Sequence, residues 1–206
     1  MPVGAFTAVY LVLAIVWARR AGNSEFMLYI GVVIALSAGI GLLHARIRLS
    51  VASLWCMSVW GLVHMAGGLV EVPSSWPING ENHVLYSLWL IPDRLKYDQV
   101  VHAYGFGVTT WLCWQGLSAA TGATRPTFGL LVLCAAGGMG FGAMNEVIEF
   151  AATLLVPETN VGGYFNTGWD LVSNLVGCTI AATIIGVTHR AEPAHADGTV
   201  EPDRMR

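Results

Sequence analysis

The sequence predicts an all-α membrane protein, a polytopic bundle of six transmembrane helices, from three observations. Of the 206 residues, 55% are hydrophobic and only 11% are charged, whereas soluble domains carry about 25% charged residues. The charges lie between uncharged runs of roughly 17–25 residues, the length of a helix that crosses a hydrocarbon core of about 30 Å. These runs do not alternate apolar and polar residues, as a transmembrane β-barrel would.

Six apolar runs define the expected helices. Arg19 and Arg20 end the first run, and Arg46 and Arg48 follow the second. The first run lacks a basic leading region and a clear cleavage site, so we interpret it as a retained helix rather than a signal peptide. The expected spans are residues 4–18, 26–43, 50–70, 98–118, 127–156 and 168–188.

The connections and ends complete the expected organisation. Residues 71–97 are rich in proline and tryptophan, which favours a loop at the membrane interface, with a short interfacial helix over residues 83–90. Glycines in the fifth run favour close approach of a neighbouring helix. Residues 1–190 are expected to form one transmembrane domain, and the polar residues 191–206 a disordered tail.

Lysine and arginine indicate how the bundle is oriented. Six spans place both termini on one side of the membrane. The side shared with the tail holds Arg46, Arg48, Arg125, Arg190, Arg204 and Arg206, and the other side holds Arg19, Arg20, Arg94 and Lys96. This small excess favours cytoplasmic termini. No basic stripe occurs, so nucleic acid is not expected as a partner.

Ionisable groups inside the predicted spans are the candidate functional residues. A charge near the bilayer centre costs roughly 2.5–3.5 kcal/mol on insertion scales, so such groups are functional candidates. The charged or ionisable candidates are His64, Asp98, His102, Glu146, Glu149 and Asp170, accompanied by Asn145 and Asn174.

Their spacing predicts that these side chains meet. His102 follows Asp98 by four residues, and Asn174 follows Asp170 by four, so each pair shares one helix face. Glu146 and the second glutamate of the fifth run are three residues apart. Because successive spans alternate in direction, all of these candidates fall in the same half of the bilayer.

Several carboxylates in one semi-buried pocket need a countercharge, because like charges and burial disfavour ionisation. Shared protons, a bound cation, or Arg94 and Lys96 folding over the mouth would supply it. No lysine or arginine lies inside the spans that carry the carboxylates, which favours a metal. The expected ligands of one or two divalent ions are His64, Asp98, His102, Glu146, Glu149 and Asp170.

These candidates lead to two alternative functions. In the first, the chain is a membrane-embedded, metal-dependent enzyme that acts on a lipid or amphiphile. Glu146 would then be the general base, and Asn145 and Asn174 would orient ligands or substrate. In the second, the chain transports or binds a small cation or amphiphile without chemistry, and the carboxylates titrate protons.

Some of these residues also have simpler interpretations. Asp98 and Asp170 lie at or beside expected helix starts, where aspartate caps free N–H groups. Capping leaves the mid-helix pair Glu146 and Glu149 unexplained. A haem held between His64 and His102 is disfavoured by the surrounding carboxylates.

Four segments resemble the YjdF-like family of bacterial inner-membrane proteins. Residues 96–107, KYDQVVHAYGFG, are similar to its YDxxxH…G segment, and residues 145–150, NEVIEF, to its YELIEW segment. Residues 166–177, NTGWDLVSNLVG, resemble its late WD helix, and residues 62–68, LVHMAGG, its LHxxGA helix. VanZ-like proteins, which are linked to glycopeptide resistance, are more distantly similar. The resemblance implies a six-helix protein of the bacterial inner membrane with this polar pocket, and no settled activity.

Overall fold

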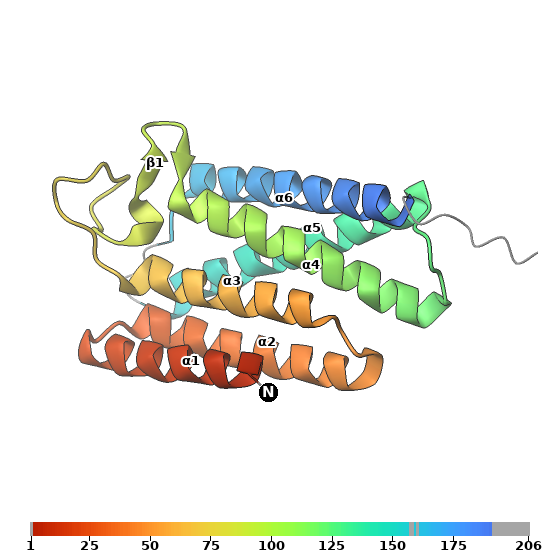
Figure 1. Ribbon diagram of the computed structural model, residues 1–206. Helices are drawn as coiled ribbons and strands as arrows, with labels where there is room; N and C mark the ends of the chain where they lie inside the picture. The colour runs from red at the N-terminus through yellow and green to blue at the C-terminus, as the bar shows by residue number, and fades with distance from the viewer. Residues whose placement is uncertain (1, 157–158, 160, 191–206) are drawn as a thin grey trace, which may run out of the picture.

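Six long helices and one small hairpin make up the computed structural model, which describes residues 2–156, 159 and 161–190 (Figure 1). The tail that the sequence predicts to be disordered, residues 191–206, lies outside the described residues. The elements are α1 (Pro2–Arg20), α2 (Ser24–Ile47), α3 (Val51–Leu69), η1 (Leu85–Ser87), β1 (Trp89–Ile91), β2 (Leu95–Lys96), α4 (Tyr97–Thr121), α5 (Phe128–Leu155) and α6 (Tyr164–Arg190).

Polar caps set the helix starts. The side-chain oxygen of Asn23 accepts a hydrogen bond from the backbone N–H of Phe26 at 2.9 Å and so caps α2. Ser50 and Thr127 cap α3 and α5 in the same way. Gly122 follows α4 in the left-handed conformation, with φ of 72°, which ends a helix at no steric cost.

The connection between α3 and α4 differs from the prediction. In place of an interfacial helix over residues 83–90, it contains only the 3₁₀ turn η1, followed by the antiparallel pair β1 and β2. Val84 and Leu88 instead form antiparallel bridges with Glu71 and Ile78, so the ends of this segment are extended and pair with the earlier part of the connection. Asp93 then adopts a positive φ of 57° between the two strands.

The helices pack as a tight trio and a flanking pair. α4 packs most extensively against α6, and both pack against α5, while α3 joins α4 to the pair α1 and α2 (Figure 1). Glycines permit the closest approach: a Cβ on Gly107 would lie 3.1 Å from the carbonyl oxygen of Gly177. The backbones of α4 and α6 therefore touch directly.

Most helix surfaces suit a lipid environment. Leu13, Leu133 and Leu154 are 62–70% exposed, as side chains that face hydrocarbon would be. Five of the six long helices are long and apolar enough to cross a membrane: α1, α2, α3, α5 and α6. The prediction of six spans is thus met for five. α4 falls short because it carries buried polar residues such as Gln99 and His102 toward its neighbours.

The hairpin lies at the end of the bundle where the candidate residues gather. α2, α4 and α6 begin at this end, and α1, α3 and α5 finish there (Figure 1). The ionisable candidates sit in the early turns of α4 and α6 and the late turns of α3 and α5. The fold therefore brings them to one level along the bundle.

Candidate functional site

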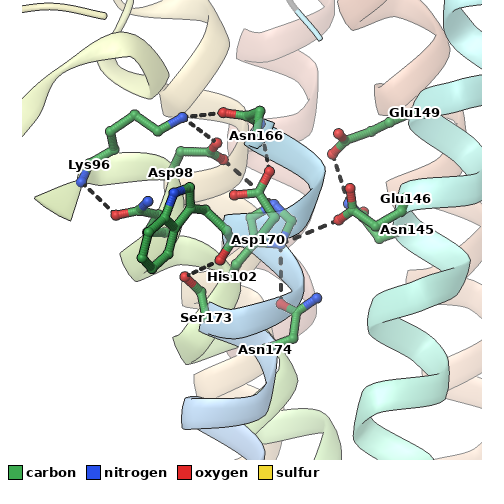
Figure 2. A network of polar contacts seen from close by, with 12 residues as sticks. Lys96, Asp98, His102, Asn145, Glu146, Glu149, Asn166, Asp170, Ser173 and Asn174 are labelled. Atoms are coloured by element: carbon green, nitrogen blue, oxygen red, sulfur yellow. Dashed lines mark hydrogen bonds and ion pairs between the residues drawn. The ribbon is translucent and has the colours of Figure 1, made fainter. Parts of the chain in front are cut away.

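His102 is the centre of a polar cluster between α4, α5 and α6 (Figure 2). Its Nε2 lies 3.5 Å from Asp98 Oδ1, the residue one turn earlier on α4. Its Nδ1 lies 3.7 Å from Glu146 Oε1 on α5 and 3.2 Å from Asn174 Oδ1 on α6. One imidazole therefore faces side chains from three helices.

α6 contributes two completely buried polar side chains, Asp170 and Asn174, each 0% exposed. Asp170 Oδ2 accepts a hydrogen bond from Asn166 Nδ2 at 2.5 Å. Asn174 packs beneath Gly142 of α5, where a Cβ would lie 2.6 Å from Asn174 Nδ2. Glycine at that position is what allows Asn174 to reach the histidine.

α5 contributes Asn145, Glu146 and Glu149. Asn145 Nδ2 donates a hydrogen bond to Glu149 Oε1 at 2.8 Å, as their four-residue spacing predicts. The Glu146 side chain is only 9% exposed. Within the part of the chain that the structure describes, no well-aligned hydrogen bond reaches either of its carboxylate oxygens.

Lys96 brings one positive charge to the carboxylates. It ends the hairpin and is 6% exposed, and its Nζ lies 3.6 Å from Asp98 Oδ2 (Figure 2). The same ammonium donates to Asn166 Oδ1. This is one of the countercharges that the sequence suggested. Arg94, named with it, is exposed on the hairpin.

His64 lies beside the cluster and has its own partner. The hydroxyl of Tyr86, from η1, forms a hydrogen bond with His64 Nδ1. The imidazole stacks on Trp60, with ring centroids 5.2 Å apart and planes 19° apart. Burial raises the pKa of Tyr86 well above its ordinary value, and the carboxylates of Asp98 and Glu149 raise it further. Tyr86 is therefore a neutral phenol at physiological pH.

A small polar cavity separates His64 from the cluster. It has a volume of about 40 Å³, and its walls include Glu25, His64, Tyr86, Asp98 and Glu149. A single water needs roughly 10–15 Å³ of such volume. There is room beside the carboxylates for water or a small group of a ligand.

The capping interpretation fails for one of the two aspartates. Asp170 comes six residues after Tyr164, the first residue of α6, so it does not cap that helix. Asp98 lies in the first turn of α4, where a negative charge favours the helix start. Asp170 is not a cap because α6 starts at residue 164, four residues before the expected residue 168.

Three residues of the site were absent from the sequence-based set: Glu25, Tyr86 and Asn166. Glu25, at the start of α2, is 6% exposed and accepts a hydrogen bond from the Tyr29 hydroxyl at 3.3 Å. The alternation of span direction already places α2's start on this side, so that signal could have identified it. Asn166 lies four residues before Asp170. This spacing places the two on one helix face only if the helix begins before residue 166, as α6 does.

Two groups of side chains have the proximity that a metal ion requires. One is Asp98, His102 and Asp170, and the other is His102, Glu146 and Glu149; within each, one ligand atom per residue lies within 4.8 Å of the others. Asp170 Oδ1 is buried and accepts no hydrogen bond from the described residues. His64 belongs to neither group.

A family profile described as "Predicted membrane protein (DUF2238)" matches residues 2–191. The chain belongs to this family. The family is described as one of predicted membrane proteins, and the matched region includes every described helix and the whole polar cluster. No curated protein and no solved structure matches the chain.

Proposed function

We propose that this DUF2238 protein is a membrane-embedded, metal-dependent enzyme that acts on a lipid or another amphiphile. The observation that carries the proposal is His102, which lies in both groups of converging ligand atoms. Imidazole and carboxylate together suit first-row divalent ions. Asp170 Oδ1 and the two Glu146 oxygens are buried and accept no hydrogen bond from the described residues, and a cation would satisfy them, because buried carboxylate oxygens without hydrogen bonds are costly.

The donor set favours one ion over two. A neutral imidazole has a single lone pair for coordination, so His102 serves one of its two groups at a time. Three protein ligands leave further coordination positions open, as in catalytic sites. A bound ion would polarise a substrate oxygen or activate water. With the ion held by Asp98, His102 and Asp170, Glu146 would remain uncoordinated and would be the general base.

The same proposal includes how the chain crosses the membrane. α4 would be the sixth span, since helices surround it and a span shielded from lipid tolerates polar residues. With six spans both termini lie on one side, which the positive-inside rule makes the cytoplasm. The site would then face the outer half of the membrane, and the resemblance to YjdF-like and VanZ-like proteins supports a bacterial inner membrane.

Elemental analysis of the purified protein tests the proposal. The wild type is expected to hold about one equivalent of a transition metal, and His102→Ala, which removes the ligand common to both groups, to lose it while remaining monodisperse. His189→Ala is the matched control, because that histidine pairs with Trp114 at the far end of α6. Full retention of metal in His102→Ala would disprove the metal site.

An absence of metal from the wild type, after loading with several divalent ions, would favour the second function. The carboxylates would then share protons and titrate during binding or transport. A flux assay in liposomes distinguishes that function, because it predicts pH-dependent movement of a ligand without a product.

A further inference from the structure

A long apolar cavity runs from the polar cluster into the bundle. Its volume is about 710 Å³, within the roughly 300–1,000 Å³ of typical ligand pockets. α2, α3, α4 and α5 form its walls. The side chains that line it are almost all apolar, among them Val32, Leu43, Met57, Phe106, Leu112 and Phe141.

The cavity is elongated along the helices. On α2 its lining extends from Tyr29 to Leu43, and on α4 from Phe106 to Ala120. Each stretch advances 14 residues, which at 1.5 Å per residue is about 21 Å. One leaflet of the hydrocarbon core is roughly 15 Å thick. The cavity is therefore long enough for a whole lipid chain.

One end of the cavity is the candidate site. His64 and Asn145 line the cavity, and Asn145 also donates to Glu149 of the metal-ligand group. Tyr29 lines both the apolar cavity and the small polar cavity beside the carboxylates. A molecule in the apolar cavity would thus bring its head to the polar cluster.

The cavity opens sideways between α2 and α5. Four lining side chains at this edge remain exposed: Leu36 at 41%, Leu43 at 37%, and Phe141 and Met144 at 56% each. Near the site the two helices meet, since Ala152 packs into the core with Phe26 and Ile30. Beyond that contact, the opening faces the region that lipid occupies in a membrane.

We propose that the cavity binds one hydrocarbon chain of a membrane lipid, with its oxygen-bearing head group at the carboxylate cluster. The inference deepens the proposed function, because it names the substrate class, and it rests on that function for the chemistry. Binding of the chain itself depends on shape and apolar area, not on the metal. The continuity of the apolar walls with Asn145 and His64 selects an amphiphile over a wholly apolar occupant.

A bulky side chain inside the cavity tests this. Gly116 on α4 and Gly39 on α2 line the cavity, and a Cβ at either position would meet nothing within 4 Å. Gly116→Phe and Gly39→Phe would therefore occupy the space of the chain without a backbone clash. Gly140→Phe is the matched control, since Gly140 is exposed on α5, is also free of neighbours within 4 Å, and lies outside the cavity lining.

The probe is hexadecanol with a photoreactive diazirine in its chain, added to the full-length protein in detergent micelles. Mass spectrometry of the digested protein maps the labelled peptides. Labelling is expected on the cavity faces of α2, α4 and α5. Each cavity variant should reduce it about tenfold, the effect of losing about 1.4 kcal/mol of binding, while Gly140→Phe should match the wild type. Gly39→Phe gives an independent reading if Gly116→Phe is not monodisperse.

The result is separable from the fate of the metal site. Chain labelling that persists in metal-free His102→Ala supports the cavity even where no metal binds. Equal labelling in the wild type and both cavity variants would mean that the probe coats only the outer surface, and would overturn the proposal. Protein–protein crosslinks between α2 and α5 of two molecules would overturn it as well, because a second copy would then fill the groove.

Discussion

At the residue scale, Lys96 partly compensates the negative charge of the carboxylates in the site. Its ammonium is the positive charge that lies against Asp98, and it sits among groups that would bind a cation. Two opposing effects follow from its removal. The carboxylates lose a compensating charge, which destabilises the metal-free fold, and a metal ion loses a repelling neighbour, which strengthens its binding.

Lys96→Met is expected to lower the stability of the metal-free protein by about 3–5 kcal/mol, the usual effect of breaking a buried pair. The same variant should bind a divalent ion more tightly than the wild type. Thermal unfolding in chelator and metal titration measure the two effects. Arg94→Met, on the exposed part of the same hairpin, should change stability by no more than about 0.5 kcal/mol. Weaker metal binding by Lys96→Met would contradict the assignment.

Tyr86 predicts a pH effect at the same scale. Burial raises its pKa in the folded protein above the ordinary value of 10.0, so above that pH the unfolded chain loses the phenolic proton first. Stability from this group is thus fully present below pH 10 and declines as the pH rises. Tyr86→Phe should show a shallower decline in thermal stability above pH 10 than the wild type. Parallel curves would show that the phenol stays exposed to water.

At the element scale, the contact between α4 and α6 determines where the ligands meet. Asp98 and His102 come from one helix and Asp170 from the other, so their distances depend on how closely the two backbones approach. That approach depends on Gly107 and Gly177. Helices in a membrane commonly associate through such small residues.

Gly177→Ala tests this dependence, because its Cβ would collide with the backbone carbonyl of Ala103. We expect a loss of stability of roughly 2 kcal/mol, in the range of overpacking, and a large loss of metal affinity. Gly168→Ala on the same helix meets nothing within 4 Å and should be neutral or stabilising by up to about 1 kcal/mol. Unchanged metal affinity in Gly177→Ala would show that α6 can retreat without opening the site.

The elements also show what the sequence could and could not predict. Apolar runs located all six helices, because a helix long enough to cross lipid leaves a long uncharged run. The same runs misplaced the start of α6, since Asn166 and Thr167 interrupt the apolar pattern within its first turn, and Asn166 was missed for that reason. η1 and the hairpin contribute Tyr86 and Lys96, and their geometry depends on hydrogen bonds that no periodicity reports.

At the scale of the whole molecule, the number of spans determines which loops share a side of the membrane. With α4 as a span, the connection between α3 and α4 lies on one face of the membrane, and the loop after α4 lies on the other. In a cysteine-free background, Glu81→Cys should react with a membrane-impermeant maleimide added outside cells, and Thr124→Cys only after the membrane is broken. Both residues are exposed. Labelling of both from the outside would show that α4 does not cross.

The whole arrangement explains why i, i+3 and i, i+4 spacing predicted so much of the cluster. Direction alternates strictly in a bundle of spans, so depth can be read from the sequence, and Asp98, Glu146 and Asp170 were placed at one level. Lateral position cannot be read in this way. His64 lies at the same depth as the cluster, but its hydrogen-bond partner is Tyr86. Only the packing of the helices determines which side chain lies beside it.

Because the hairpin carries Lys96, its position affects both the access of water to the site and the net charge of the site. β2 runs directly into α4, and the backbone N–H of Lys96 donates to Gln99 Oε1 at 2.9 Å, so the hairpin and the first turn of α4 form one unit. A movement that lifts this unit from the site would withdraw Lys96 together with Asp98 and would leave Glu146, Glu149 and Asp170 without that ammonium. The mouth would be acidic whenever it is open to water, and a field of that sign attracts cations and repels anions.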